Sequence, residues 1–547
     1  MTVNQAVIDS LVDNDVDTVF GIPGKQSLPL NETIGERDDI RFVVARHETA
    51  VTHQAWGYAS TGDRMAATVV VPGPGDMNAM NGLKNALNDC VPLVHFAIET
   101  DPDLRGGDAI HETPPDTYDN VVKENVLVET PEATVAEVER AIAVARTPPK
   151  GPVRVGIPKS FLAADAALAD PPEFDTEYAA GVPADAVAEA RDLLADAADP
   201  VVLAGGGVRA AGATDELVAV AERLGAPIVT TYKGKGVVPE RHDLSAGTLS
   251  GSASPELLTC LADADACLAV GTDLDAHASR GWSVELPDAL VHATLGAGDI
   301  GRGYEPTVGI VGDARGVLAS LAEGLDDAGI DRADLGAERA SAVRDATDER
   351  LDPLLGDSTP ITSVRALRAI RNALPEEAVV AVDAGGFRVW ALNVFDAAGP
   401  RKYVNPGSWA TMGTGLPSAI GAAYANPDAP VVALTGDGGL MMCVHELHTA
   451  AVEDLPVTVV VLNNDDYAII SEEAGRSYRL SEQEYGWADA PVDFTAVAEG
   501  MGVDAYRADA PADIRDGLDA ALRSDGPALV EVRTDPLEPQ ASQFMAE

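Results

Sequence analysis

The sequence has few lysines, few cysteines, few aromatic residues and no long hydrophobic run. The chain contains 88 acidic residues but only 38 basic ones, of which eight are lysine, and its formal net charge is -50. Nucleic-acid binding needs a basic patch, so this composition argues against that class. The acidic residues lie in every segment, which indicates a surface adapted to high salt, where repulsion between charges is screened. An acidic surface without that adaptation is the alternative, and the scarcity of lysine argues against it.

Cysteines and apolar runs are too sparse for a disulfide framework or a membrane span. No apolar run approaches the roughly 20 residues that cross a bilayer. Residues 1–17 show an amphipathic helical pattern without the basic start and apolar centre of a signal peptide. The cysteines, none in a Cys-X-X-Cys pair, are Cys90, Cys260, Cys267 and Cys443. We expect a cytoplasmic protein in which these are small core residues.

The chain is long enough for several domains. Its 547 residues exceed what one hydrophobic core supports, and 46% hydrophobic content excludes a disordered chain. Apolar strand-like runs alternate with helical segments, which predicts an α/β protein built from doubly wound parallel sheets. The first and third blocks share the same order of elements. We place three domains at 1–165, 185–335 and 361–535, with 166–184, rich in Ala, Asp and Pro, as a linker.

The strongest chemical signal lies between Val431 and Ile470. An apolar strand ends at Gly436-Asp437-Gly438-Gly439, one helical segment runs to Val452, and a second apolar strand ends at Asn463-Asn464-Asp465-Asp466. Ligands bind at the carboxyl ends of parallel strands. Glycines let backbone amides approach a phosphate, and a helix N-terminus favours an anion. The pattern predicts a bound diphosphate; an ordinary strand–helix–strand unit with turn-forming residues is the alternative.

The spacing of the two polar turns sharpens this prediction. Asp437 and Asn464 carry hard oxygen donors that suit Mg2+. Gly-Asp-Gly with Asn-Asn at this distance resembles the signature of enzymes that use thiamine diphosphate (ThDP). The resemblance implies a Mg2+ site formed by Asp437, Asn464 and the backbone carbonyl of Asp466. It implies further cofactor contacts at Gly436, Gly438, Gly439, Tyr467, Ala468 and Ile469.

Nearly the whole chain is similar to the ThDP-dependent decarboxylase and acetolactate synthase superfamily. That resemblance implies a pyrimidine-binding, a central and a diphosphate-binding domain. Residues 46–59, RHETAVTHQAWGYA, resemble a segment of acetolactate synthase whose Glu, here Glu48, contacts N1′ of the aminopyrimidine. A carboxylate there raises the acidity of the 4′-amino group, which then removes the C2 proton of the thiazolium ring. An exposed Glu favoured by the helix dipole is the alternative.

Three further segments resemble cofactor contacts of this superfamily. Residues 73–78 (GPGDMN) resemble the turn that faces the thiazolium ring, and 383–387 resemble a loop whose backbone touches the diphosphate. Residues 409–423 resemble a segment whose Met props the cofactor into a bent shape and whose Ala carbonyl accepts from the 4′-amino group. That Met could also be core filler. The residues assigned in this way are Pro74, Asn78, Gly385, Gly386, Phe387, Ala410 and Met412.

The resemblance defines the cofactor better than the substrate. Acetolactate synthases carry Phe-Gln-Glu where this chain has Ile110-His111-Glu112. His111 is either a catalytic proton donor or acceptor or a surface loop residue. The chain has no Gln-Trp near Ile469–Glu473, where acetolactate synthases shape the acceptor pocket. It has Thr272–Asp275 where they carry a flavin-contacting Arg-Phe-Asp-Asp, which disfavours FAD. Lys25 either meets a substrate carboxylate or is solvated.

The expected activity is Mg2+- and ThDP-dependent decarboxylation of a 2-oxoacid followed by carboligation, as in an acetolactate synthase-like transferase. One alternative is a simple 2-oxoacid decarboxylase, a lyase of the benzoylformate decarboxylase-like kind, that releases an aldehyde. Two others are a non-catalytic ThDP-binding regulatory protein and a flavin- or nicotinamide-linked oxidoreductase that uses Gly205-Gly206-Gly207. The resemblance also implies a homodimer or homotetramer in which two chains share each active site.

Overall fold

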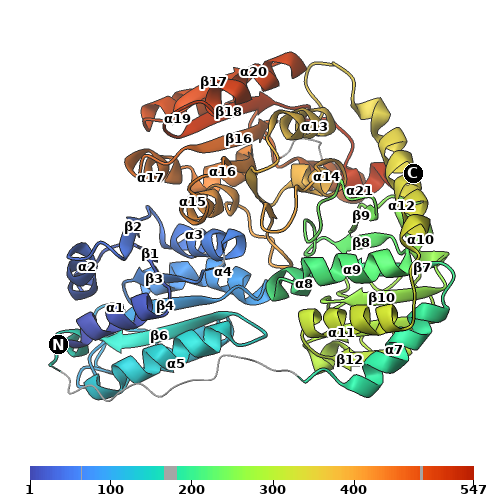
Figure 1. Ribbon diagram of the computed structural model, residues 1–547. Coiled ribbons are helices and arrows are strands. Elements are labelled where there is room, and N and C mark those ends of the chain that lie inside the picture. Colours follow the sequence, from blue (N-terminus) through green and yellow to red (C-terminus); the bar gives the residue numbers. More distant parts are fainter. Residues whose placement is uncertain (63, 166–180, 481–484, 547) are drawn as a thin grey trace.

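The computed structural model contains three parallel six-stranded sheets with helices on their faces (Figure 1). This arrangement confirms the predicted α/β class with three doubly wound units. Each sheet falls inside one of the predicted blocks, whose limits we retain as proposed domain limits. The predicted linker lies almost entirely outside the described residues. The structure describes residues 1–62, 64–165, 181–480 and 485–546.

The first sheet has the strand order β2-β1-β3-β4-β6-β5. Its inner strands are buried along their whole length, as expected for strands covered on both faces. The strands are β1 (Thr18–Gly21), β2 (Arg41–Val44), β3 (Ala66–Val70), β4 (Leu93–Glu99), β5 (Glu124–Leu127) and β6 (Pro152–Pro158). The α-helices are α1 (Val3–Asp13), α2 (Leu28–Gly35), α3 (Glu48–Thr61), α4 (Pro74–Asn88), α5 (Thr134–Arg146) and α6 (Lys159–Leu162).

The central sheet has the order β12-β11-β10-β7-β8-β9 and packs its own hydrophobic core. Its strands are β7 (Pro200–Ala204), β8 (Ile228–Thr231), β9 (Ser245–Leu249), β10 (Ala266–Val270), β11 (Leu290–Thr294) and β12 (Val308–Val311). The α-helices of this part are α7 (Ala184–Asp196), α8 (Gly206–Ala211), α9 (Thr214–Leu224), α10 (Pro255–Ala262), α11 (Ala314–Asp327) and α12 (Ala333–Leu351).

The third sheet, β14-β13-β15-β16-β18-β17, repeats the strand order of the first. Its strands are β13 (Val379–Val382), β14 (Tyr403–Val404), β15 (Val431–Gly436), β16 (Val457–Asn463), β17 (Asp504–Ala508) and β18 (Ala528–Arg533). Its α-helices are α13 (Ser363–Ala373), α14 (Gly386–Val394), α15 (Gly415–Ala425), α16 (Asp437–Cys443), α17 (Glu446–Val452), α18 (Ala468–Tyr478), α19 (Phe494–Gly500), α20 (Pro511–Ala521) and α21 (Ala541–Phe544).

One sequence expectation for this sheet is wrong. The single helical segment expected between β15 and β16 is two helices, α16 and α17, interrupted by a turn at Val444-His445. The interruption starts a new helix at Glu446, whose side chain bonds to the first domain. Tertiary contacts therefore override a locally continuous helical pattern.

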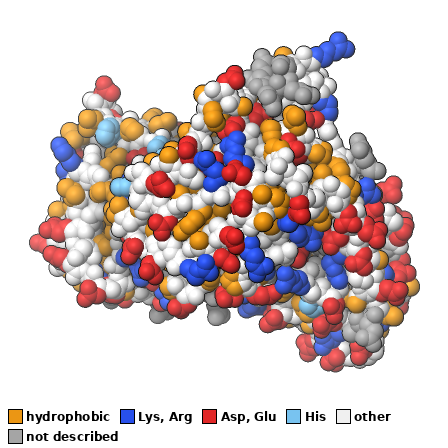
Figure 2. Space-filling model, turned by 90° about the horizontal axis from the view of Figure 1, so that it is seen from above, with side chains coloured by type: hydrophobic (Ala, Val, Ile, Leu, Met, Phe, Trp, Pro, Cys, Tyr) orange, Lys and Arg blue, Asp and Glu red, His pale blue; other side chains and the backbone are white. Residues whose placement is uncertain are grey.

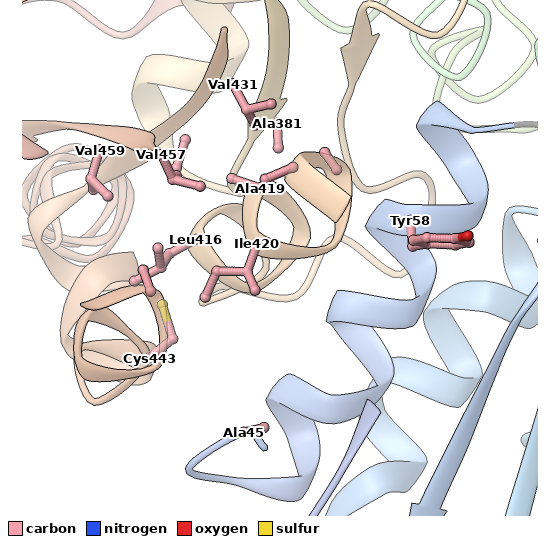
Figure 3. Packing of buried hydrophobic residues seen from close by; sticks show 14 of the residues in the cluster. Ala45, Tyr58, Ala381, Leu416, Ala419, Ile420, Val431, Cys443, Val457 and Val459 are labelled. Atoms are coloured by element: carbon pink, nitrogen blue, oxygen red, sulfur yellow. The ribbon is translucent and has the colours of Figure 1, made fainter. Parts of the chain in front are cut away.

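Helices α3 and α15 join the first and third domains at the centre of the molecule (Figures 1 and 3). A Cβ added at Gly57 would lie 2.1 Å from the Ser418 carbonyl oxygen, and one at Gly421 would lie 1.8 Å from the Gln54 carbonyl oxygen. The two helices cross so closely only because both positions lack a side chain. The residues around them form one hydrophobic cluster that includes Tyr58 and extends into both sheets.

The surface shows the charge expected from the composition. Acidic side chains are spread over the visible face, with basic and hydrophobic side chains among them (Figure 2). In the described part of the chain, no helix combines the length and the hydrophobicity that crossing a bilayer requires.

The crossing of α3 and α15 predicts that Gly57→Ala destabilises the protein. Alanine has the higher helix propensity, but its methyl group would meet the Ser418 carbonyl oxygen at 2.1 Å. We expect a loss of about 1–3 kcal/mol, as for other overpacked cores, measured by urea unfolding at constant high salt. Gly35→Ala in α2 is the matched control, since nothing lies within 4 Å of its added Cβ. Equal midpoints for Gly57→Ala and wild type would contradict the close crossing.

Candidate active site

The polar turns of the third domain meet at one edge of its sheet. Strand β13 pairs with β15, and β15 pairs with β16, all in parallel. Their carboxyl ends therefore bring together Asp383, the turn 436–439 and the segment 464–469. This is the edge of an open parallel sheet at which ligands bind.

Asp437 is the first residue of α16 and is buried. Its Oδ1 accepts from the Gly438 amide at 2.8 Å, and its Oδ2 accepts from the Asn464 amide at 3.2 Å. Burial raises its pKa to about 6, although these backbone hydrogen bonds lower it, and the nearby Asp465 raises it further. Within the described ranges, no Lys, Arg or His pairs with this carboxylate. A buried carboxylate without a charged partner is a suitable ligand for a bound cation.

The donor set around Asp437 suits Mg2+. Asn464 is half-buried beside it, whereas the preceding Asn463 is buried and donates from Nδ2 to Glu531 at 2.7 Å. The second Asn is therefore the one on the side of Asp437, as strand alternation requires. One carboxylate and one amide oxygen leave the remaining positions to water and phosphate, the arrangement typical of Mg2+. Among the described residues, no cluster of three or more His, Cys, Asp or Glu side chains offers a different metal site.

The third predicted metal ligand, Asp466, has its side chain occupied. Its Oδ1 accepts from the Ser471 hydroxyl at 2.6 Å in α18, and its backbone amide donates to Asn464 Oδ1 at 3.2 Å. The prediction that Asp466 contributes its backbone carbonyl is compatible with this arrangement. Ala468 starts α18 directly after this turn.

Glycines allow the turn to approach its neighbours. A Cβ at Gly438 would lie 2.5 Å from the Tyr467 ring and 3.2 Å from the end of the Met412 side chain. The Tyr467 ring meets Trp487 edge-on, with ring centroids 5.1 Å apart. The structure thus brings Gly438, Tyr467 and Met412 together, as the cofactor assignment requires.

The remaining assigned residues line the same edge. A Cβ at Gly386, at the start of α14, would lie 3.2 Å from Ile469, and Gly385 and the buried Phe387 flank it. Gly439 follows in α16, and Gly436 ends β15. Ala410 has φ +47°, a left-handed conformation that alanine rarely adopts. Such strain persists where the surroundings hold the backbone in a required orientation.

Asp383 lies in the segment 383–387 assigned by resemblance, but the role of its side chain was not predicted. It is fully buried and accepts hydrogen bonds from four donors. These are the backbone amides of Ala384 (2.7 Å), Gly413 (3.2 Å) and Thr414 (3.1 Å) and the hydroxyl of Thr435 (2.9 Å). Burial raises its pKa to about 6. Asp383 thereby fixes the loop that carries Ala410 and Met412; its place directly after a buried strand was the only signal for it.

The first domain holds Glu48 at the first turn of α3. Glu48 Oε2 accepts from Asn78 Nδ2 at 3.1 Å, and a Cβ at Gly75 would lie 3.2 Å from Glu48 Oε1. Pro74 and Asn78 belong to the first turn of α4. This turn and Glu48 therefore contact each other, while their contacts with the cofactor stay predictions.

His111 lies in an exposed loop beside the same turn. A Cβ at Gly73 would meet the His111 carbonyl oxygen at 2.5 Å, and His111 itself has φ +68°. Its backbone is near the site, while its side chain is exposed. Lys25 is also exposed. The catalytic role of His111 stays a prediction.

The two halves of the assigned site remain separate within one chain. Among the described residues, no hydrogen bond or ion pair joins Glu48 or Asn78 to the group around Asp437. The first domain does reach the loop that carries Ala410, because Asn81 of α4 bonds to Trp409 and Thr411 at 2.6 and 3.0 Å.

Comparisons with known proteins match the whole chain. Three family models fit in order: thiamine pyrophosphate enzyme, N-terminal TPP binding domain (1–120), central domain (187–321) and C-terminal TPP binding domain (383–532). A probable acetolactate synthase large subunit of Methanocaldococcus jannaschii is 29% identical over 98% of this chain and 92% of its own length. Acetolactate synthase large subunits of Corynebacterium glutamicum and Parasynechococcus marenigrum are 30% and 31% identical, over 97% and 96% of this chain and 86% of each relative.

The hydrogen bonds of Asp383 predict that Asp383→Ala is strongly destabilising. It leaves three backbone amides without an acceptor, while the Thr435 hydroxyl keeps the Gly436 carbonyl at 3.1 Å, and each unpaired buried amide costs on the order of 1–3 kcal/mol. Urea unfolding of the cofactor-free protein measures the loss. Asp493→Ala, which removes an exposed cap of α19 in the same domain, should cost only about 1 kcal/mol. Similar losses in the two variants would show that Asp383 does not organise the loop.

Proposed function

The chain belongs to the thiamine pyrophosphate enzyme family, in its acetolactate synthase group, and from that premise we propose that it catalyses Mg2+- and ThDP-dependent decarboxylation of a 2-oxoacid followed by carboligation. The observation that carries the proposal is the buried Asp437 carboxylate, which lacks a cation partner beside glycines at a helix N-terminus. An anionic diphosphate next to this carboxylate needs a bridging cation.

The residues present fit this cofactor and metal. Asp437, Asn464 and the carbonyl of Asp466 would hold Mg2+, and the amides at the start of α16 would meet the diphosphate. Met412 and Ala410, fixed through Asp383, would support and bind the pyrimidine end. Bound ThDP supplies a carbon nucleophile and an electron sink for decarboxylation.

The chain's own residues supply positioning and proton control. Glu48 would hold a proton at N1′ of the aminopyrimidine, and Asn78 keeps its carboxylate in place through the 3.1 Å hydrogen bond. Tyr467 and Trp487 form an aromatic wall that limits the access of water beside Gly438. His111 is proposed as a proton donor or acceptor for the 2-oxoacid steps.

Release of an aldehyde is the second outcome we consider for the same site. The chain departs from acetolactate synthases at Ile110-His111-Glu112 and at Ile469–Glu473, the positions that face the acceptor in the resembled enzymes. These differences concern the fate of the decarboxylated fragment and leave the cofactor residues unchanged. The presence of Glu48 argues against a non-catalytic ThDP-binding protein.

FAD remains disfavoured, although the central domain contains a suitable space. A cavity of about 510 Å³ lies at the carboxyl ends of the central strands, beside Gly206 and Gly207. At the position of the flavin-contacting motif, Asp273 and Asp275 form ion pairs with Lys233 at 3.0 and 2.9 Å. This segment therefore offers acidic side chains that are already paired, in place of an arginine.

Product analysis tests the proposed function. Purified protein with ThDP and Mg2+ in high salt should consume a 2-oxoacid from a panel of pyruvate, 2-oxobutyrate, branched and aromatic acids, and form CO2 and a 2-hydroxy-3-oxo acid that is substituted at C2. Aldehyde as sole product would favour the decarboxylase. Cofactor binding without turnover of any member would overturn both, and an absorbance spectrum of the same preparation would reveal a bound flavin.

We infer that two chains share each active site. Large hydrophobic side chains are exposed around both halves: Met77 on α4, Met441 and Met442 on α16, and Ile470 on α18. On an otherwise acidic surface, such residues indicate a protein interface. A second copy placed by a two-fold axis would set the Glu48 half of one chain against the Asp437 half of its partner. High salt in the cytoplasm would screen the repulsion between two such acidic chains.

Mixed dimers test the shared site. Glu48→Gln and Asp437→Ala chains should each be inactive alone, the latter because it binds no ThDP. After mixing, each mixed dimer contains one intact and one doubly altered site, so activity should return. Light scattering across a salt series should show the dimer dissociating, with loss of activity, as salt is removed. An active monomer, or no recovery on mixing although mixed dimers form, would contradict the model.

A further inference from the structure

A charged network lies inside the first domain, on the buried side of the turn that carries Pro74 and Asn78. Its members are at most 8% exposed, although they sit among apolar strands and helices. They come from β3, β4, β6 and the first turn of α4. The members are Thr68, Asp76, His95, Glu99 and Arg154.

Hydrogen bonds connect these side chains in one row. The Thr68 hydroxyl lies 2.6 Å from His95 Nδ1, and His95 Nε2 lies 3.0 Å from Asp76 Oδ1. Arg154 donates to Asp76 Oδ2 from Nε at 2.9 Å and from Nη2 at 2.6 Å, and also binds Glu99. Because a carboxylate only accepts, His95 directs the hydrogen on Nε2 at Asp76, and its other ring nitrogen bonds to the Thr68 hydroxyl.

The network keeps Asp76 ionised in a fully buried position. Burial raises the pKa of Asp76, but the hydrogen bond from His95 and the charge of Arg154 outweigh it, so the pKa is lowered. The Tyr118 ring lies over the Arg154 guanidinium at 4.1 Å. Buried ion pairs contribute little to stability compared with apolar packing of the same volume. Because the network contributes little to stability, we look for its role in fixing the geometry of the elements that it joins.

The element that the network fixes is the first turn of α4. Asp76 is the third residue of that helix and points into the core, whereas Asn78, two residues later, is exposed. Gly75 and Asn78 are the two residues of this turn that contact the Glu48 carboxylate. The Thr49 hydroxyl also binds the Asn78 carbonyl at 2.8 Å. The buried side of the turn is thus held by His95 and Arg154, and its exposed side holds Glu48.

We propose that His95 and Asp76 are positioning residues, which set the orientation of the Glu48 carboxylate through the first turn of α4. The inference rests on the proposed function, because it assumes that Glu48 acts on N1′ of ThDP. His95 acts only through Asp76 and Asn78 and touches neither cofactor nor substrate. Asp383 orients the Met412 loop from the other half of the site, so each half has its own buried carboxylate as an anchor.

The test compares two buried histidines. His95→Val removes the hydrogen bonds to Thr68 and Asp76. His292→Val in β11 is the matched control, since His292 is equally buried on a strand of the central sheet and bonds there to the Thr272 carbonyl at 2.9 Å. Both variants should lower the urea midpoint. Only His95→Val should slow C2–H exchange of bound ThDP, measured by NMR, on the order of 10²-fold, as expected when a reacting group is misplaced.

Two further measurements separate positioning from general damage. In the cofactor-free protein, His95→Val should speed amide hydrogen exchange of residues 74–78, and His292→Val should not. The Kd for ThDP should stay close to that of wild type in both, since the diphosphate half is intact. His95→Gln, whose amide can donate to Asp76, should restore most of the C2–H exchange rate.

The outcomes distinguish the inference from the proposed function. The positioning role is overturned if His95→Val leaves C2–H exchange unchanged, or if His292→Val slows it equally. The role of Glu48 stands in that case, provided that Glu48→Gln still slows exchange by about 10²–10⁴-fold. Unchanged exchange in Glu48→Gln overturns the role of Glu48 itself. If His95→Val does not fold, Thr68→Val is used in its place. This variant removes only the hydrogen bond between Thr68 and His95, so it should slow C2–H exchange less. An unchanged exchange rate in Thr68→Val counts against the proposal.

Discussion

The hydrogen bonds of Glu446 are the interaction on which both halves of the site depend. This buried residue starts α17, and its Oε1 accepts from the backbone amides of Arg46 (2.9 Å) and His47 (3.1 Å), directly before Glu48. Its Oε2 accepts from Gln54 in α3 at 3.0 Å. Burial raises its pKa, although these hydrogen bonds lower it. One carboxylate therefore ties the start of α3 to the helix pair that begins at Asp437.

Buried acids organise this protein while exposed acids keep it soluble. A chain with net charge -50 that binds an anionic cofactor must confine its positive charge to defined places. In the third domain Asp383 is satisfied by four neutral donors, and Asp437 is left for a metal ion. In the first domain Asp76 forms an ion pair with Arg154, one of the few buried arginines. The proposed Mg2+ would give Asp437 a partner, as Arg154 does for Asp76.

The sequence predicts most inner strands and the polar turns because both are local patterns. It misses the inner strand β18 and the edge strands β5, β9, β12, β14 and β17. Of these, β5 and β12 are short and partly exposed, and β9 contains Gly247 and pairs irregularly with β8. It assigns Asp437, Asn464 and Glu48 from motifs. It does not predict the role of the Asp383 side chain or the Asp76–His95–Arg154 network. Both depend on partners 19 to 78 residues away, and pairing at such distances has no signature in a single sequence.

The separation of the two halves in one chain has a mechanical consequence. If two chains share each site, the Glu48 and Asp437 of one chain belong to different sites of the dimer. Glu446 and the crossing of α3 with α15 connect these two residues rigidly within the chain. When one site closes around its cofactor, the first and third domains of a chain would then move as one unit, and this unit also contributes residues to the other site. Any coupling between the two sites would therefore run through the interface between the first and third domains, where α3 and α15 pack backbone against backbone.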